Sequence, residues 1–372
     1  MKKSVHIVAF DVPFPADYGG VIDIYHKIRS LNSLGVSVIL HCFQYGRQES
    51  EELNKICKKV YYYKRSKYRN PFIGDVPYIV LTRSNEELLQ NLKKDSFPIV
   101  FEGIHCTFFL NHPDLKDRIR LVRNHNIEHD YYKNLELVES NYFKKYFFRN
   151  ESDNLRIYEK NLKTATAVLA ISPPDHQYLN KKYHNSVLVP AFHANDDVTV
   201  TTGKGKFILY HGNLGVGENN FAAMYLVNEV FSKLKMRCVI AGSHPSDELI
   251  KACQKHKHIE LIDHWNNTEI MNAVSEAHIN VLPTFQGTGI KLKLLNALYC
   301  GRYCVVNPTM VLNTTLESAC HICENSEEMV GVIEGLWKKE FTEELLKERR
   351  ELLENSLFDN KKNAQIILEL LG

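Results

Sequence analysis

The chain has 372 residues, of which 44% are hydrophobic and 24% are charged. This length exceeds what one hydrophobic core usually serves, and the composition excludes a collagen, a coiled coil and a disordered tail, so we expect two globular domains. Nine cysteines without an apolar leader after Lys3 argue against a secreted disulfide framework and favour the cytoplasm. No window approaches the roughly 20 apolar residues of a membrane span, so any membrane association is expected to be peripheral.

The net charge of +2 hides an asymmetry. Residues 1–190 carry 28 basic and 21 acidic side chains, whereas residues 191–372 carry 18 and 23. The first half also holds two segments, 58–69 and 142–149, that mix basic with aromatic residues. Such segments suit an anionic membrane surface, and the alternative is a solvated face over core aromatics. Nucleic acid is not expected as a partner, because no recognised binding module is present.

Two stretches share a layout of strand, glycine-containing loop, helix and strand. The first consists of an apolar run at 5–10, a loop at 11–20, a helical periodicity at 21–34 and a β-rich run at 36–43. The second consists of the corresponding segments at 207–211, 212–218, 219–234 and 237–241. Such units build parallel sheets, because a strand that returns in the same direction needs a crossover helix.

Further strands are expected in both halves, at 98–101, 120–122, 167–171, 187–189, 259–262, 279–282 and 303–306. We therefore predict an α/β fold with two doubly wound domains that face a central cleft, where ligands bind at the carboxyl ends of the strands. The expected boundaries are a first domain at 1–190, a linker at 191–205, a second domain at 206–342, and C-terminal helices at 343–372.

The most informative segment for chemistry runs from Phe285 to Gly301. Gly287 and Gly289 stand between an expected strand and an expected helix, where free N–H groups and the helix dipole favour a phosphate. Lys291 and Lys293 add two ammonium groups for a diphosphate. The alternative is an ordinary glycine loop before a helix of an α/β domain.

A second glycine loop, 211–220, reads G-x-x-G-x-G, and Gly19–Gly20 opens the first helix. The order in 211–220 is neither the dinucleotide fingerprint nor a Walker loop, so neither NAD nor ATP is indicated.

Four segments together resemble the retaining nucleotide-sugar glycosyltransferases of the GT-B fold, in the family 4 or group 1 type with an E-x7-E motif. The segments are 13–20 (PFPADYGG), 123–128 (RNHNIE), Gly212-Asn-Leu with Asn219–Asn220, and 287–301. The resemblance implies a UDP- or GDP-sugar donor, no cofactor, no metal, and a glycan or lipid-linked acceptor. It implies that the C-terminal helices at 343–372 cross back to pack on the first domain. It implies the catalytic candidates His125, Gly20 and Glu128, with His125 facing the transferred sugar. It implies the donor-binding candidates Gly19, Gly212, Asn213, Thr288, Gly289, Lys291, Lys293 and Asn296.

The sequence departs from the family pattern at several positions. The two motif glutamates fall on Thr288 and Asn296, and the usual Arg and Lys of the first loop are replaced by Asn213 and the region of Glu218. Asn296 would accept from the ribose through its amide oxygen. A nucleotide-sugar 2-epimerase of the same fold and a catalytically inactive nucleotide-binding relative therefore remain as alternatives.

Other motifs point weakly to function. His125-Asn-Ile-Glu-His129 has zinc-like spacing, but the segment is a poor helix interior, so its histidines are not expected to align. Cys320 and Cys323 are expected to be small buried hydrophobes. His105 follows a strand end and is a weak candidate for the acceptor site.

Overall fold

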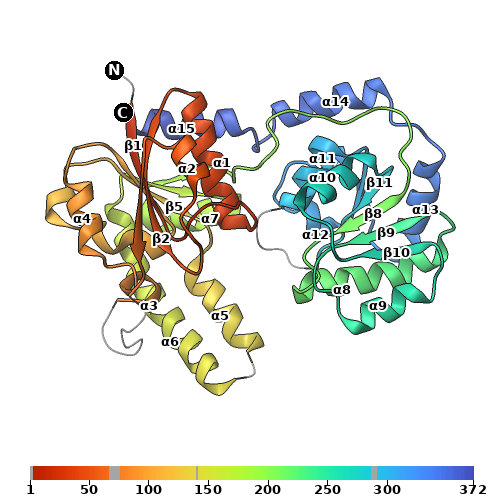
Figure 1. Cartoon of the computed structure of the whole chain (residues 1–372), viewed down its shortest axis with the longest axis horizontal. Coiled ribbons are helices and arrows are strands. Elements are labelled where there is room, and N and C mark those ends of the chain that lie inside the picture. Colours follow the sequence, from red (N-terminus) through yellow and green to blue (C-terminus); the bar gives the residue numbers. More distant parts are fainter. Residues whose placement is uncertain (1–2, 67–75, 140, 286–290) are drawn as a thin grey trace. The chain divides into compact units, whose positions relative to one another are not determined.

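The computed structural model describes residues 3–66, 76–139, 141–285 and 291–372. The chain divides into two compact units, one formed by Met1–Ala194 with Asn360–Gly372 and the other by Asn195–Asp359 (Figure 1). Each unit is built on a parallel sheet with helices packed on it, which confirms the predicted α/β class with two Rossmann-like domains.

The first sheet contains seven strands within the described residues, in the order β3-β2-β1-β4-β5-β6-β7. Their bounds are β1 Ser4–Ala9, β2 Ser37–Gln44, β3 Lys59–Lys64, β4 Ile99–Glu102, β5 Arg120–Asn124, β6 Ala167–Ala170 and β7 Ser186–Leu188. All neighbours pair in parallel, and the strand order reverses between β1 and β4. Ligands of such sheets bind at the carboxyl ends of the strands beside this reversal.

The second sheet has six strands in the part of the chain that the structure describes, in the order β10-β9-β8-β11-β12-β13. Their bounds are β8 Ile208–His211, β9 Cys238–Ala241, β10 Ile259–Ile262, β11 Ile279–Val281, β12 Tyr303–Val306 and β13 His321–Ile322. The order reverses between β8 and β11, so the loop after His211 and the loop before Lys291 both follow strands at the reversal. The strands β3 and β13 were not predicted.

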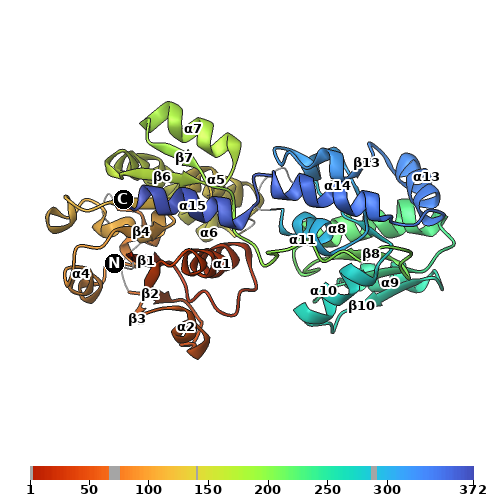
Figure 2. The same ribbon diagram turned by 90° about the horizontal axis from the view of Figure 1, so that it is seen from above.

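Helices cover the sheets of both units (Figures 1 and 2). In the first unit the α-helices are α1 Gly19–Ser33, α2 Glu51–Ile56, α3 Tyr78–Leu81, α4 Glu86–Leu92, α5 Glu128–Val138, α6 Tyr142–Tyr158, α7 Pro173–Tyr183 and α15 Asn360–Leu370. In the second they are α8 Gly217–Tyr225, α9 Asp247–Gln254, α10 Asn267–Glu276, α11 Leu292–Cys300, α12 Pro308–Val311, α13 Ser326–Trp337 and α14 Glu343–Glu354. The helix expected at 219–234 changes to a π-helical turn at Leu226–Val230 and a 3-10 turn at Phe231–Lys233.

The domain boundaries differ from the prediction in two ways. The segment at 191–194 belongs to the first unit, because Ala191, Phe192 and His193 are fully buried there. Of the two C-terminal helices, only α15 packs on the first unit, where Ala364 and Ile367 join the core beside α1 (Figure 2). The helix α14 belongs to the second unit, since its Leu346 and Leu353 lie in that core.

The two basic and aromatic segments are placed differently. Of the first segment, residues 59–64 form the edge strand β3, where the Tyr61 and Tyr63 rings stack on His41 and pack on the core. Residues 67–69 lie outside the described residues. The second forms the start of α6, which runs beside α5 as a helical hairpin (Figure 1). In the described part of the chain, none of the helices combines the length and the apolar character needed to cross a bilayer. All nine cysteines are free. Cys323 is buried, as expected for a small hydrophobe, whereas Cys320 is only partly buried.

Candidate functional site

One asparagine of α8 forms hydrogen bonds both with the glycine loop after β8 and with Lys293. Asn219 Nδ2 donates to the carbonyl oxygen of Asn213 at 2.9 Å, and Asn219 Oδ1 accepts from Lys293 Nζ at 2.6 Å. A Cβ atom at Gly212 would lie 3.2 Å from Asn219 Cγ and 3.3 Å from Lys293 Nζ, so glycine leaves the space in front of the ammonium group open. The structure thus brings together Gly212, Asn213 and Lys293, which lie some eighty residues apart in the sequence.

The Lys293 ammonium group is only weakly compensated by the protein. Burial lowers the pKa of Lys293 to about 8, and Glu218 opposes this shift while Lys291 adds to it. Burial also lowers the pKa of Lys291. Glu218 itself accepts a short hydrogen bond from the Thr284 hydroxyl group. A desolvated ammonium group whose direct protein partner is a neutral amide favours an anionic ligand.

Sequence reasoning missed His211, the last residue of β8. Its Nε2 is buried and has no hydrogen-bond partner among the described residues. Burial, with Lys293 nearby, lowers the pKa of His211 to about 3, so the imidazole is neutral and Nε2 is free to meet a ligand atom. Its position next to Gly212 at a predicted strand end was the available signal.

The loop before α11 carries the remaining donor-binding predictions. Thr288 and Gly289 lie outside the described residues. The helix α11 begins at Leu292, with Lys291 in the N-cap position, rather than directly after Gly289 as predicted. Asn296 lies half-buried on α11, and its Oδ1 accepts from Asn195 Nδ2 at 2.9 Å. The amide oxygen assigned to the ribose therefore has one protein donor, and its second lone pair can still accept from a ligand hydroxyl group.

In the first unit the predicted residues gather around the ring of Phe10, which directly follows β1. A Cβ atom at Gly20 would lie 2.6 Å from Phe10 Cζ, so the glycine at the start of α1 lets this ring pack closely. The Phe10 ring then meets the His125 ring edge-on, with 5.3 Å between centroids, and the His105 ring at 5.5 Å. Gly19 is the first residue of α1. The structure thus places His125, Gly20 and the weak candidate His105 in one cluster.

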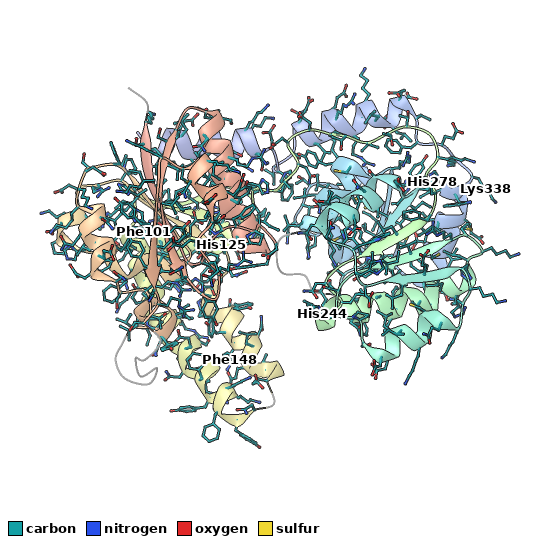
Figure 3. All side chains as sticks on the ribbon, in the orientation of Figure 1. Phe101, His125, Phe148, His244, His278 and Lys338 are labelled. Carbon is teal, nitrogen blue, oxygen red and sulfur yellow. The ribbon has the colours of Figure 1, made fainter. Side chains whose placement is uncertain are left out.

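His125 follows β5 directly and is labelled in Figure 3. Its Nε2 lies 3.0 Å from Glu102 Oε2, and its Nδ1 is buried without a hydrogen-bond partner among the residues that the structure describes. Burial lowers the pKa of His105 well below its ordinary value, so that second imidazole is neutral.

Glu128 is the first residue of α5 and is buried. Burial raises the pKa of its carboxyl group to about 7, against the opposing effects of Asn126 and Arg83. A carboxyl group that titrates near neutral pH has the pKa of a general acid or base. The zinc-like spacing forms no site, because His125 contacts Glu102 whereas His129 contacts Glu159 at 3.0 Å.

Sequence reasoning also missed a buried set of charged side chains beside His125. Asp23 and Lys27 come from α1, Glu102 ends β4, and Arg123 lies in β5. Asp23, Glu102 and His125 present ligand atoms within 4.8 Å of one another, as a metal site would. However, Lys27 Nζ lies 3.1 Å from Asp23 and 2.7 Å from Glu102, so an ammonium group occupies the place of a cation. Glu102 and Arg123 directly follow the predicted strands at 98–101 and 120–122, and this was the available signal for part of the set.

Solved structures share the fold of this chain. TarM matches with a TM-score of 0.69 and 10% identity, over 100% of this chain and 99% of TarM. MurG of Acinetobacter baumannii matches with a TM-score of 0.54 and 13% identity, over 99% of each chain. A UDP-glucosyltransferase from Polygonum tinctorium matches with a TM-score of 0.53 and 11% identity, over 100% of this chain and 99% of that one. The chain therefore has the GT-B fold.

The sequence of the second unit is similar to a known family. Residues 205–339 match the family described as "Glycosyl transferases group 1". Over nearly the whole chain, a relative described as "Uncharacterized 44.6 kDa protein in cps region" of Klebsiella pneumoniae is 25% identical over 351 residues, 89% of this chain and 87% of that protein. The family match and the shared fold together support a glycosyltransferase.

Proposed function

We propose that the protein is a retaining glycosyltransferase that transfers a sugar from a UDP- or GDP-sugar to a surface-glycan or lipid-linked acceptor without a metal. The observation that carries this proposal is the site around Gly212, Asn219 and Lys293 at the strand reversal of the second sheet. It lies within the residues that match the glycosyl transferase family. The relative described as lying in a cps region supports a surface-glycan acceptor.

The proposed chemistry needs charge stabilisation more than a protein base. The bond between the sugar and the donor phosphate breaks as the acceptor oxygen forms the new glycosidic bond on the same face. The acceptor proton passes to a phosphate oxygen of the leaving diphosphate. Lys293 and Lys291 would stabilise the negative charge that develops on that diphosphate, and the protein would position both reactants. The first unit, with His125, Gly20 and Glu128, would hold the sugar and the acceptor.

A donor screen tests this function. The protein should release UDP or GDP from one sugar nucleotide of a panel, slowly with water and faster with a lipid-linked or oligosaccharide acceptor, and the product should keep the anomeric configuration of the donor. Mass spectrometry follows release, and NMR assigns the anomer. A sugar isomerised without an acceptor would identify a 2-epimerase instead. Nucleotide binding without turnover over the whole panel would identify an inactive relative, for which Thr288 and Asn296 in place of the motif glutamates are the supporting observation.

We also propose that the tip of the α5–α6 hairpin binds an anionic membrane from the cytoplasmic side. Tyr142 and Phe143 are each 87% exposed and Tyr146 is 61% exposed, whereas Phe147 and Phe148 pack on Tyr78 and Tyr132. The basic residues of the same turn are Lys144, Lys145 and Arg149. Exposed aromatic rings among basic side chains match the headgroup layer of an anionic bilayer.

Replacing Tyr142, Phe143 and Tyr146 together by serine should reduce binding to anionic vesicles about tenfold or more, because burial of each ring contributes about 1 kcal/mol or more. Sedimentation with phosphatidylglycerol vesicles at low and high salt measures this. Ile157→Ser, which removes an exposed apolar side chain at the far end of α6, is the matched control and should retain binding. Equal recovery of the wild type in the supernatant with and without vesicles would remove the proposal.

A further inference from the structure

Five ionisable side chains form one buried network in the first unit. They come from α1, the end of β4, β5 and the residue after β5, and they are Asp23, Lys27, Glu102, Arg123 and His125. The side chains of the first four are 0% exposed, and that of His125 is 8% exposed. Removing so many ionisable groups from water costs a large desolvation free energy unless each group is paired. The contacts within the network therefore determine the protonation state of each group.

The contacts run in a single chain from the backbone to His125. Arg123 donates to both carboxylate oxygens of Asp23, at 3.0 and 2.7 Å, and to the carbonyl oxygens of Val189 and Pro190. Lys27 Nζ bridges the two carboxylates, at 3.1 Å from Asp23 and 2.7 Å from Glu102. The other oxygen of Glu102 lies 3.0 Å from His125 Nε2.

The charges of this network balance when the imidazole is neutral. Two carboxylates face one ammonium and one guanidinium group, so a proton added to His125 would leave an uncompensated positive charge in a buried site. Burial disfavours ionisation of Asp23, but Arg123 and Lys27 more than offset this and hold its pKa below the ordinary value. Lys27 lies between the two carboxylates, and a neutral His125 is the state in which the charges of these five groups sum to zero.

The hydrogen bond to Glu102 then selects one tautomer. An ionised carboxylate accepts hydrogen bonds and donates none, so His125 must place its proton on Nε2. The lone pair of the neutral ring is consequently on Nδ1. That atom is buried and has no hydrogen-bond partner within the described ranges of the chain, so its lone pair can accept a hydrogen bond from a ligand.

We propose that Lys27 and Glu102 are positioning residues that hold His125 as its neutral Nε2–H tautomer, so that Nδ1 accepts a hydrogen bond from a hydroxyl group of the bound sugar. The binding of a sugar at this position rests on the proposed glycosyltransferase function. The tautomer of His125 follows from the contacts of the network and does not depend on that function. In this role His125 orients the sugar and takes no proton, because protonation would unbalance the buried charges. The reaction proton remains with the donor phosphate.

The substitution Glu102→Gln tests the proposal with almost no change of shape. The ammonium group of Lys27 has only donors, so it will face the amide oxygen of the glutamine. The amide NH2 group will then face His125 Nε2, which must become an acceptor, and the proton will move to Nδ1. The variant should therefore present a donor where the wild type presents an acceptor.

Long-range proton–nitrogen NMR spectra of the imidazole rings read the tautomers directly at neutral pH. The His125 signals are assigned by their loss in His125→Asn. We expect Nε2–H in the wild type and Nδ1–H in E102Q, with the signals of His129, which pairs with Glu159, unchanged. A protonated ring or an Nδ1–H tautomer in the wild type would overturn the proposal, even if E102Q failed to fold. An unchanged tautomer in a folded E102Q variant would also overturn it.

A second readout separates this proposal from the function on which it draws. With an active donor and acceptor pair, E102Q should lower kcat/KM about 100-fold, as expected for loss of one well-placed polar group, while UDP binding to the second unit stays unchanged. Unaltered kcat/KM with an altered tautomer would contradict the role of Nδ1. Absence of turnover in the wild type, with the expected tautomer, would contradict the proposed function and leave the positioning of His125 standing.

Discussion

Lys293→Ala should weaken the binding of UDP and GDP by about 10- to 100-fold, because a hydrogen bond to a charged group contributes about 1.5–3 kcal/mol. The double variant with Lys291→Ala should show no measurable binding, since burial has already lowered the pKa values of both lysines and leaves them dependent on an anionic partner. Isothermal titration calorimetry measures both affinities. Lys338→Ala, an exposed lysine of the same unit that Figure 3 labels, is the control and should bind as the wild type does.

The same site predicts a pH dependence. Lys293 titrates at about 8 in the free protein, so it is charged below this pH and neutral above it. The terminal phosphate of UDP, with a pKa of about 6, is fully ionised from neutral pH upward. Affinity should therefore be highest near neutral pH and fall by up to about tenfold per pH unit above 8. Affinity that rises with pH above 8, or binding undiminished in the double variant, would contradict the donor site.

Asp23→Asn should destabilise the first unit by about 3–5 kcal/mol, because it leaves the buried Arg123 and Lys27 with one carboxylate between them. Urea unfolding followed by circular dichroism measures the loss, with the first unit unfolding before the second. Asp153→Asn, which removes an exposed carboxylate from α6, is the matched control and should change the free energy of unfolding by no more than about 0.5 kcal/mol.

The sign of the pH effect on this network follows from the lowered pKa of Asp23. A carboxylate with a folded-state pKa below its unfolded value of about 3.9 stabilises the fold above that pH and loses this contribution as the pH falls further. The wild type should therefore lose stability below about pH 4 more steeply than Asp23→Asn. Equal acid sensitivity of the two proteins would show that Asp23 is not held ionised by Arg123 and Lys27.

Local patterns in the sequence were sufficient for most of the fold. The repeated strand, loop and helix layout at 5–43 and 207–241 predicted both Rossmann-like units, because apolar runs and glycine stops depend on neighbouring residues alone. The strand β13 is only two residues long and escaped prediction for that reason. The edge strand β3 was not predicted, and its residues were assigned either to a membrane surface or to a solvated face over core aromatics. The stacking of Tyr61 and Tyr63 on His41, which lies in another strand, favours the second alternative.

Residues of the site could be predicted only where they belong to a motif that is continuous in the sequence. Gly212, Lys293 and His125 lie in or beside glycine loops and strand ends, and the sequence singled them out as candidates. His211 and Glu102 were not assigned, since the burial of His211 beside Lys293 and the contact of Glu102 with His125 depend on residues distant in the sequence. The hydrogen bond that Asn296 accepts from Asn195, about a hundred residues away, was likewise not predictable from local sequence.

The sequence by itself thus determined the α/β class, the two units and the glycine-marked strand ends, since period and turn chemistry are local properties of the chain. Only the tertiary structure decided that Asp23, Lys27, Glu102 and Arg123 balance one another beside His125. It alone also decided that α14 and α15 belong to different units. The burial and pairing of a side chain depend on which residues, distant in the sequence, contact it in the folded chain. These contacts determine the charge of each group, the tautomer of His125 and the atom that is left to bind a ligand.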